Sequence, residues 1–138
     1  MESAPSDRRN EGGKGSVALT GATGFIGGAI AKRLADSGWS VKALVRDLAK
    51  ANSLARLGVE LVHGDLEDTA ALRSLLLGVQ AVVHCAGVVR GIDLEDFSRI
   101  NVAGAERLAS LAATMDPPPL FVALSSLAAR EPQLSHYA

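Results

Sequence analysis

The sequence predicts an α/β fold in which helices cover both faces of a doubly wound parallel sheet. Five short apolar runs alternate with four segments of helical periodicity, which implies right-handed βαβ crossovers. The runs are apolar throughout rather than alternating, as in strands buried on both faces. A glycine-rich turn follows the first run, at the place where such sheets bind ligands. We therefore expect strand order 3-2-1-4-5.

The strands are expected where the apolar runs are short and end in turn residues. "SVALT" and "SVKALV" are the first two, and "VELVH", "VQAVVHCA" and "LFVALSS" follow along the chain. The predicted strands are therefore 16–20, 40–45, 59–63, 79–86 and 120–126.

The helices are expected where apolar residues recur at helical spacing and a glycine or proline follows. Asp68 is a predicted N-cap, and Gly38, Gly58 and Gly78 are predicted helix stops. The longest helix carries a stripe formed by Phe97, Gly104, Leu108, Leu111 and Met115. The predicted helices are 25–38, 47–58, 68–78 and 93–115.

Composition limits the class of protein. The 138 residues suggest one domain, at 16–138, behind a polar, glycine-rich tail at 1–15 that we expect to be disordered. A net charge of −1 without a basic stripe argues against nucleic acid and anionic membrane partners. No apolar run reaches the roughly 18 residues of a membrane span. The single cysteine excludes an internal disulfide and favours the cytoplasm.

The glycine-rich turn is the strongest motif. In "TGATGFIGG", residues 20–28, Gly21, Gly24 and Gly27 are spaced three apart between a strand and a helix. Gly21 permits a tight turn, Gly24 lets a pyrophosphate approach the backbone, and Gly27 lets the helix pack on the strand. The N–H groups at the start of the helix then face the phosphates. The predicted contacts from this turn are Gly21, Thr23, Gly24, Phe25, Ile26 and Gly27.

The turn and the later motifs together resemble the extended short-chain dehydrogenase/reductases, the NAD-dependent epimerase/dehydratase group. "LVRD", "GDLED", "HCAG", "NVAG" and "LSS" follow the turn in the order of that family. The resemblance covers about residues 16–138 and implies a Rossmann-like fold. It also implies that Asp65 and Leu66 border the adenine, and that Ala86 and Gly87 line the cofactor. His84 and Cys85 are interpreted as packing residues; no partner is identified for His63 or His136, and no metal site is predicted.

The end of the second strand bears on the choice of cofactor. The usual NAD fingerprint places an acid there for the ribose 2′-hydroxyl, but the matching residue is Val45. The next residue, Arg46, can pair with a 2′-phosphate, so NADP is preferred and NAD remains possible. Asp47 is the rival feature, because it could serve the hydroxyl or cap the second helix. Lys42 lies on the same strand but is expected to be too far back.

The resemblance also implies catalytic residues. Tyr137 would be the general acid/base, Ser126 would hold the substrate oxygen, and Asn101 would support the active-site backbone. Ser125 is an alternative to Ser126. The family places a lysine four residues after the tyrosine, at position 141, and further strands and a substrate region beyond it. The chain is therefore interpreted as the N-terminal piece of a longer enzyme, with some apolar surface left uncovered.

Two classes of function remain open from the sequence. The leading hypothesis is a nicotinamide-dependent oxidoreductase, epimerase or dehydratase that acts on a small molecule, with this piece expected to bind cofactor without turnover. The alternative is a non-catalytic dinucleotide-binding sensor or accessory subunit. A third hypothesis, binding of a different nucleotide such as a flavin, is less well supported. The sequence lacks the G-x-x-x-x-G-K-[ST] pattern of a mononucleotide phosphate loop. Helices beside the sheet, including 93–115, could form a homodimer.

Overall fold

The sheet is parallel and has the predicted order. A computed structural model describes residues 13–87 and 93–137, so residues 1–12 of the predicted tail lie outside the described residues. Neighbouring strands pair in the order β3-β2-β1-β4-β5, and all four pairings are parallel. The strands are β1 (Ser16–Thr20), β2 (Ser40–Val45), β3 (Glu60–His63), β4 (Ala81–His84) and β5 (Leu120–Ala123).

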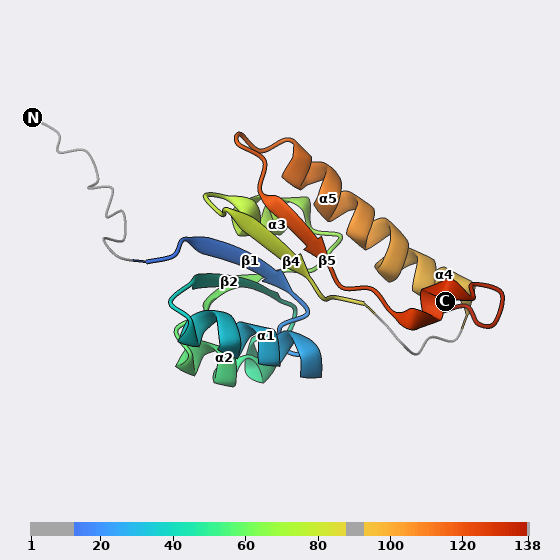
Figure 1. Ribbon diagram of the computed structural model, residues 1–138, viewed down its shortest axis with the longest axis horizontal. Coiled ribbons are helices and arrows are strands. Elements are labelled where there is room, and N and C mark those ends of the chain that lie inside the picture. Colours follow the sequence, from blue (N-terminus) through green and yellow to red (C-terminus); the bar gives the residue numbers. More distant parts are fainter. Residues whose placement is uncertain (1–12, 88–92, 138) are drawn as a thin grey trace, which may run out of the picture.

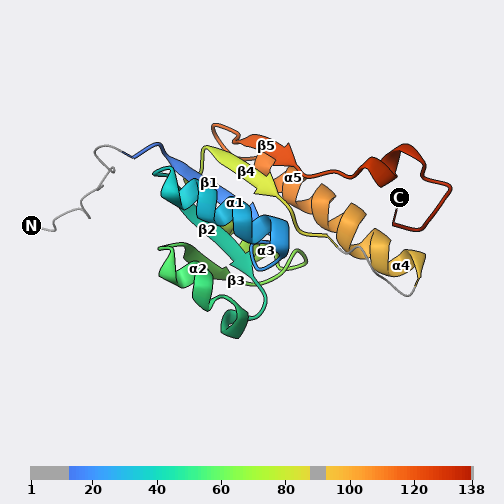
Figure 2. The same cartoon turned by 60° about the horizontal axis from the view of Figure 1, so that its bottom comes forward.

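The helices form a layer on each face of the sheet (Figures 1 and 2). One layer contains α1 and α2, and the other contains α3 and α5. An apolar core lies between each layer and the sheet. One core contains Leu19 and Leu54, and the other contains Leu72 and Leu108. The α-helices are α1 (Phe25–Asp36), α2 (Asn52–Arg56), α3 (Thr69–Leu76), α4 (Leu94–Phe97) and α5 (Ala105–Ala113).

Two predicted helices are wrong as single α-helices. The segment 47–58 divides into a 3₁₀ turn, η1 (Leu48–Lys50), and the short α2. The Asp47 carboxylate accepts the N–H of Ala49 and starts η1, so it acts as a cap. The segment 93–115 contains a π-helix, η2 (Ser98–Gly104), between α4 and α5. Periodicity does not separate these helix types over so few residues, because all of them place side chains three to five apart on one face.

Other local signals predicted the elements correctly. The Asp68 carboxylate accepts the N–H of Ala71 and caps α3. Phe97, Gly104 and Leu108 of the predicted stripe are buried. The last three strands are shorter than the predicted 59–63, 79–86 and 120–126: β3 begins at Glu60, β4 extends only from Ala81 to His84, and β5 ends at Ala123. The residues after each strand leave the ladder.

A buried lysine links the sheet to α3. Lys42 lies in β2 and is only 9% exposed. Its Nζ donates to the carbonyl oxygens of Ser74, at 2.6 Å, and Leu77, at 3.1 Å, which end α3. The ammonium thereby caps a helix C-terminus, where a positive charge is favourable. This contact explains why Lys42 does not line the cavity described below.

The outer strand leaves apolar side chains exposed. Leu120 is 69% exposed and Val122 is 47% exposed, in the last strand of the sheet. This agrees with the expectation of uncovered apolar surface. Within 13–87 and 93–137, no helix combines the length and apolar character that crossing a membrane requires.

Candidate functional site

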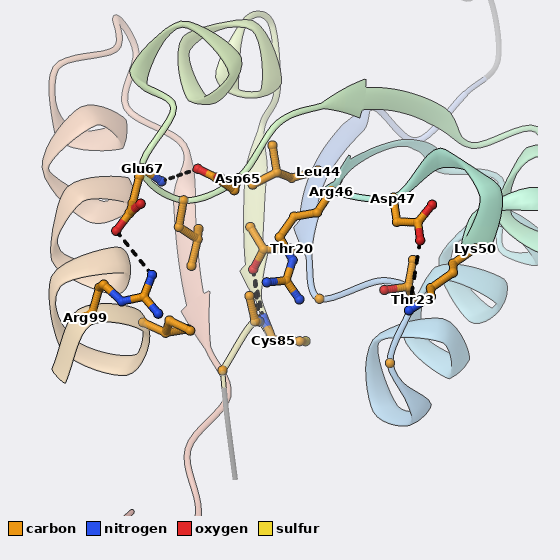
Figure 3. A pocket seen from close by; sticks show the side chains of 16 residues that line it. Thr20, Thr23, Leu44, Arg46, Asp47, Lys50, Asp65, Glu67, Cys85 and Arg99 are labelled. Atoms are coloured by element: carbon orange, nitrogen blue, oxygen red, sulfur yellow. Dashed lines mark hydrogen bonds and ion pairs between the residues drawn. The ribbon is translucent and has the colours of Figure 1, made fainter. Parts of the chain in front are cut away.

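A cavity of about 380 Å³ lies where the carboxyl ends of the strands meet (Figure 3). It opens between β1 and β4, where the strand order reverses, which is the place where doubly wound sheets bind ligands. Its size fits a small-molecule site. The lining residues are Thr20, Gly21, Thr23, Gly24, Leu44, Arg46, Asp47, Lys50, Asp65, Leu66, Glu67, Cys85, Ala86, Gly87, Arg99 and Ile100.

The glycine turn forms one wall and cannot hold side chains at two positions. Gly21 has a φ of 73°, and a Cβ there would lie 2.7 Å from the backbone nitrogen of Ala86. A Cβ at Gly27 would collide with the carbonyl oxygen of Gly21. Helix α1 begins after Gly24 without a side-chain cap, so the first N–H groups are available to a ligand. This cradle fits a pyrophosphate.

A buried threonine fixes the adjoining wall, which the turn after β4 forms. Thr20 is fully buried, and its hydroxyl pairs with Nδ1 of His84 at 2.7 Å. The hydroxyl oxygen also accepts the N–H groups of Cys85, at 3.2 Å, and Ala86, at 3.1 Å. Burial lowers the pKa of His84, which favours the neutral imidazole, and a neutral ring can accept a hydrogen bond from the Thr20 hydroxyl. The threonine therefore holds the turn after β4 against β1.

The segment after β2, through the turn η1, carries three charged side chains that line the cavity. Arg46 follows the buried Val45, and Figure 3 shows its side chain extending into the middle of the cavity. Oδ1 of Asp47 accepts the N–H of Ala49, and Oδ2 of the same carboxylate lies 4.0 Å from Nζ of Lys50. The sequence identified no partner for His63. In the structure its Nε2 forms a hydrogen bond with the carbonyl oxygen of Arg46 at 3.2 Å.

The loop after β3 forms the far end of the cavity. Oδ1 of Asp65 accepts the N–H groups of Glu67, at 2.8 Å, and Asp68, at 3.1 Å, so this carboxylate shapes the loop. Asp68, rather than Asp65, caps α3. Oε1 of Glu67 lies 3.8 Å from Nη1 of Arg99 in η2 (Figure 3). Both side chains are 55% exposed. An exposed pair at this distance contributes little stability.

A second cavity, of about 410 Å³, adjoins η2. Asn101 and Tyr137 both line it, and the Tyr137 ring lies 6.3 Å from the ring of Phe97. Oδ1 of Asn101 lies 3.1 Å from the place that a Cβ on Gly87 would take, so Asn101 approaches the turn that lines the first cavity. The segment that carries Tyr137 returns beside α4 after leaving β5 (Figures 1 and 2).

The structure brings together most of the predicted residues. Eight of the predicted cofactor contacts line the first cavity, and Asn101 and Tyr137 share the second. Phe25, Ile26 and Gly27 are not in the first lining, and Phe25 is 96% exposed. Ser126 lines neither of these two cavities, and its hydroxyl oxygen accepts the N–H of Ala128. The eight predicted residues in the first cavity are Gly21, Thr23, Gly24, Arg46, Asp65, Leu66, Ala86 and Gly87.

Sequence reasoning missed several lining residues. Lys50 follows Arg46 by four positions, a spacing that could have indicated it if the turn η1 had been recognised. Cys85 packs against the apolar core, as interpreted from the sequence, but it also lines the cavity, and burial raises the pKa of its thiol. Arg99 and Ile100 come from η2, and only the tertiary fold places them there. In the described parts of the chain, no group of three metal-ligating side chains comes together.

Comparison with known proteins decides the family. The NmrA-like family matches residues 13–109, which is most of the chain. The chain belongs to the NmrA-like family. This match, together with the reductase and the short-chain dehydrogenase described next, confirms the resemblance to the short-chain dehydrogenase/reductases. The same fold is found in a protein assigned as an NAD-dependent epimerase/dehydratase from Bacillus halodurans, at a TM-score of 0.76 and 23% identity over 89% of this chain and 59% of that one.

Two further relatives indicate the chemistry found in this group. The ceramide reductase of Caulobacter vibrioides is 42% identical over 91% of this chain, and the aligned part is 39% of that protein. A short-chain dehydrogenase from Sphingobium yanoikuyae in complex with NADPH has a TM-score of 0.76 and 26% identity, over 89% of this chain and 58% of that one. The NmrA-like chain thus spans about two fifths of the curated relative. One of these two relatives is named a reductase, and the other is a dehydrogenase solved with NADPH.

Proposed function

We propose that this NmrA-like chain is the dinucleotide-binding portion of a reductase or dehydrogenase and that it prefers NADP to NAD. The observation that carries the proposal is Arg46, which lines the cavity directly after β2. A guanidinium there can bind a 2′-phosphate through two parallel hydrogen bonds. The carboxylate of Asp47, the rival feature, accepts the N–H of Ala49 and lies beside the ammonium of Lys50. Two cationic side chains, Arg46 and Lys50, therefore line this end of the cavity, which favours a 2′-phosphate over a 2′-hydroxyl. The solved relatives include one in complex with NADPH and others in complex with NAD, so the choice of NADP rests on Arg46.

The remaining contacts follow the length of a dinucleotide. The pyrophosphate would lie against Gly21, Gly24 and the first N–H groups of α1. The adenine would lie against Asp65 and Leu66 at the far end, where Oδ1 of Asp65 already holds the loop. Phe25, Ile26 and Gly27 remain predicted contacts, with Gly27 acting through its close approach to Gly21.

For the whole protein we propose a carbonyl or hydroxyl substrate in the second cavity. The nicotinamide would supply or accept hydride. Tyr137 would exchange a proton with the substrate oxygen, and Asn101 would support Gly87 at the junction of the two cavities. The role of Ser126 in holding that oxygen stays a prediction, because Ser126 does not line this cavity. The domain limits 16–138, the cytoplasmic location and a homodimer remain predictions.

Cofactor choice is tested by titration. NADP⁺ and NAD⁺ are titrated against the wild type, Arg46→Ala and a control, Arg33→Ala, which removes an exposed arginine of α1. A charge-assisted contact contributes about 1.5–3 kcal/mol, so Arg46→Ala is expected to lose about ten- to 150-fold in NADP⁺ affinity and little in NAD⁺ affinity. Equal or tighter NAD⁺ binding by the wild type, with no NADP⁺ loss in the variant, would contradict the proposal.

A further inference from the structure

We propose that Arg107 is a positioning residue for the adenine end of the cavity, and that it controls dinucleotide affinity without touching the dinucleotide. The inference rests on the proposed function, because that function places adenine against Leu66. It concerns α5, a helix that supplies no residue to the lining of either cavity.

The first observation is a hydrogen bond between distant parts of the chain. Nη1 of the half-buried Arg107 donates to the carbonyl oxygen of Leu66 at 2.7 Å. Leu66 lines the cavity between Asp65 and Glu67, which also line it. A bond from a guanidinium in a partly buried place is stronger than an exposed ion pair. Arg107, rather than the exposed Arg99–Glu67 pair, is therefore the main polar link from this loop to the helix.

The second observation is the packing of Gly104 against the same leucine. Gly104 is buried, and a Cβ there would lie 2.8 Å from Cδ1 and 3.2 Å from Cβ of Leu66. Leu66 can take its present place only because this position carries no side chain. Gly104 and Arg107 are three residues apart and therefore lie on one face of the helix. Together they fix the backbone and the side chain of Leu66.

The same helical run also reaches the other wall. Asn101 of η2 approaches Gly87, and Ile100 lines the cavity. The segment from η2 to α5 thus contacts the loops after β3 and after β4. Loss of the Arg107 bond would release the wall after β3, while the wall after β4 keeps its bonds to Thr20. The effect should therefore be confined to the adenine end.

The experiment measures the affinity of the 138-residue chain for NADP⁺, NAD⁺ and 5′-ADP by calorimetry. The variants are Arg107→Met, Arg107→Lys and a control, Arg73→Met, which removes an exposed arginine of α3. Arg107→Met is expected to weaken all three ligands by about tenfold, with the NADP⁺/NAD⁺ ratio unchanged. Arg107→Lys should recover part of the loss, and the control should match the wild type.

A second variant and a stability measurement separate positioning from general stabilisation. Gly104→Ala retains Arg107 but displaces Leu66, and it should also weaken 5′-ADP. A lower urea midpoint for Arg107→Met with ligand affinities within twofold of the wild type would overturn the positioning role, as would a loss restricted to NADP⁺. A wild type that binds none of the three ligands would instead overturn the proposed function on which the inference rests.

Discussion

Replacing Thr20 with valine should destabilise the protein and disturb the cavity wall after β4. The two side chains have similar shapes, so Thr20→Val removes one hydroxyl from a fully buried position. That hydroxyl pairs with Nδ1 of His84 and accepts the N–H groups of Cys85 and Ala86. The substitution therefore changes hydrogen bonding with little change in packing.

The expected magnitude follows from which partners are left alone. The Cys85 N–H still has the backbone oxygen of Thr20, at 3.2 Å. Nδ1 of the buried His84 and the N–H of Ala86 lose a partner, and each unsatisfied buried group costs about 1–3 kcal/mol. Ala86 is only half-buried, so water can replace its partner in part. We expect a loss of about 2–3 kcal/mol in the free energy of unfolding.

Urea unfolding followed by circular dichroism measures this loss as a lower midpoint with an unchanged slope. Thr20→Ser keeps the hydroxyl and should retain most of the stability, losing about 1 kcal/mol for the missing methyl group. Thr23→Val, at an exposed position of the same turn, should change stability by less than about 0.5 kcal/mol. A loss below about 0.5 kcal/mol for Thr20→Val would refute the reasoning.

Two further predictions concern other buried groups. Lys42→Met removes two bonds from a charged donor to the end of α3 and should cost about 1.5–3 kcal/mol in urea unfolding, whereas Lys32→Met, at an exposed pair with Asp36, should cost less than about 0.5 kcal/mol. Burial lowers the pKa of His84 in the folded state, so the unfolded state binds more protons and stability should fall as the pH drops below about 6.5. The urea midpoint should fall less between about pH 7.5 and pH 5.5 in His84→Gln than in His63→Gln; equal falls would contradict this assignment.

Local signals in the sequence account for much of the fold. The alternation of apolar runs and helical segments predicted parallel strands, because such strands need a crossover between them. Together with the glycine turn after the first strand, it predicted the strand order. The Asp68 cap is a contact within three residues, which sequence spacing can reveal. The helix types within 47–58 and 93–115 were wrong, because short 3₁₀ and π segments share the spacing of an α-helix.

Part of the candidate site was also within reach of the sequence. Gly21 directly follows β1 and Arg46 directly follows β2, so the carboxyl edge of a parallel sheet brings them together. Lys50 was missed because the turn η1 was taken as part of an α-helix.

Only the tertiary structure reveals the hydrogen-bond partners that lie far apart along the chain. His63 holds the carbonyl oxygen of Arg46, 17 residues away, and Arg107 holds that of Leu66, 41 residues away. The hydroxyl of Thr20 meets His84 across 64 residues. Spacing patterns reach only a turn or two of helix or a few residues of strand. Such pairs depend on how the layers pack, so the sequence determined the sheet and its glycine turn, and the packing determined which side chains hold the site in place.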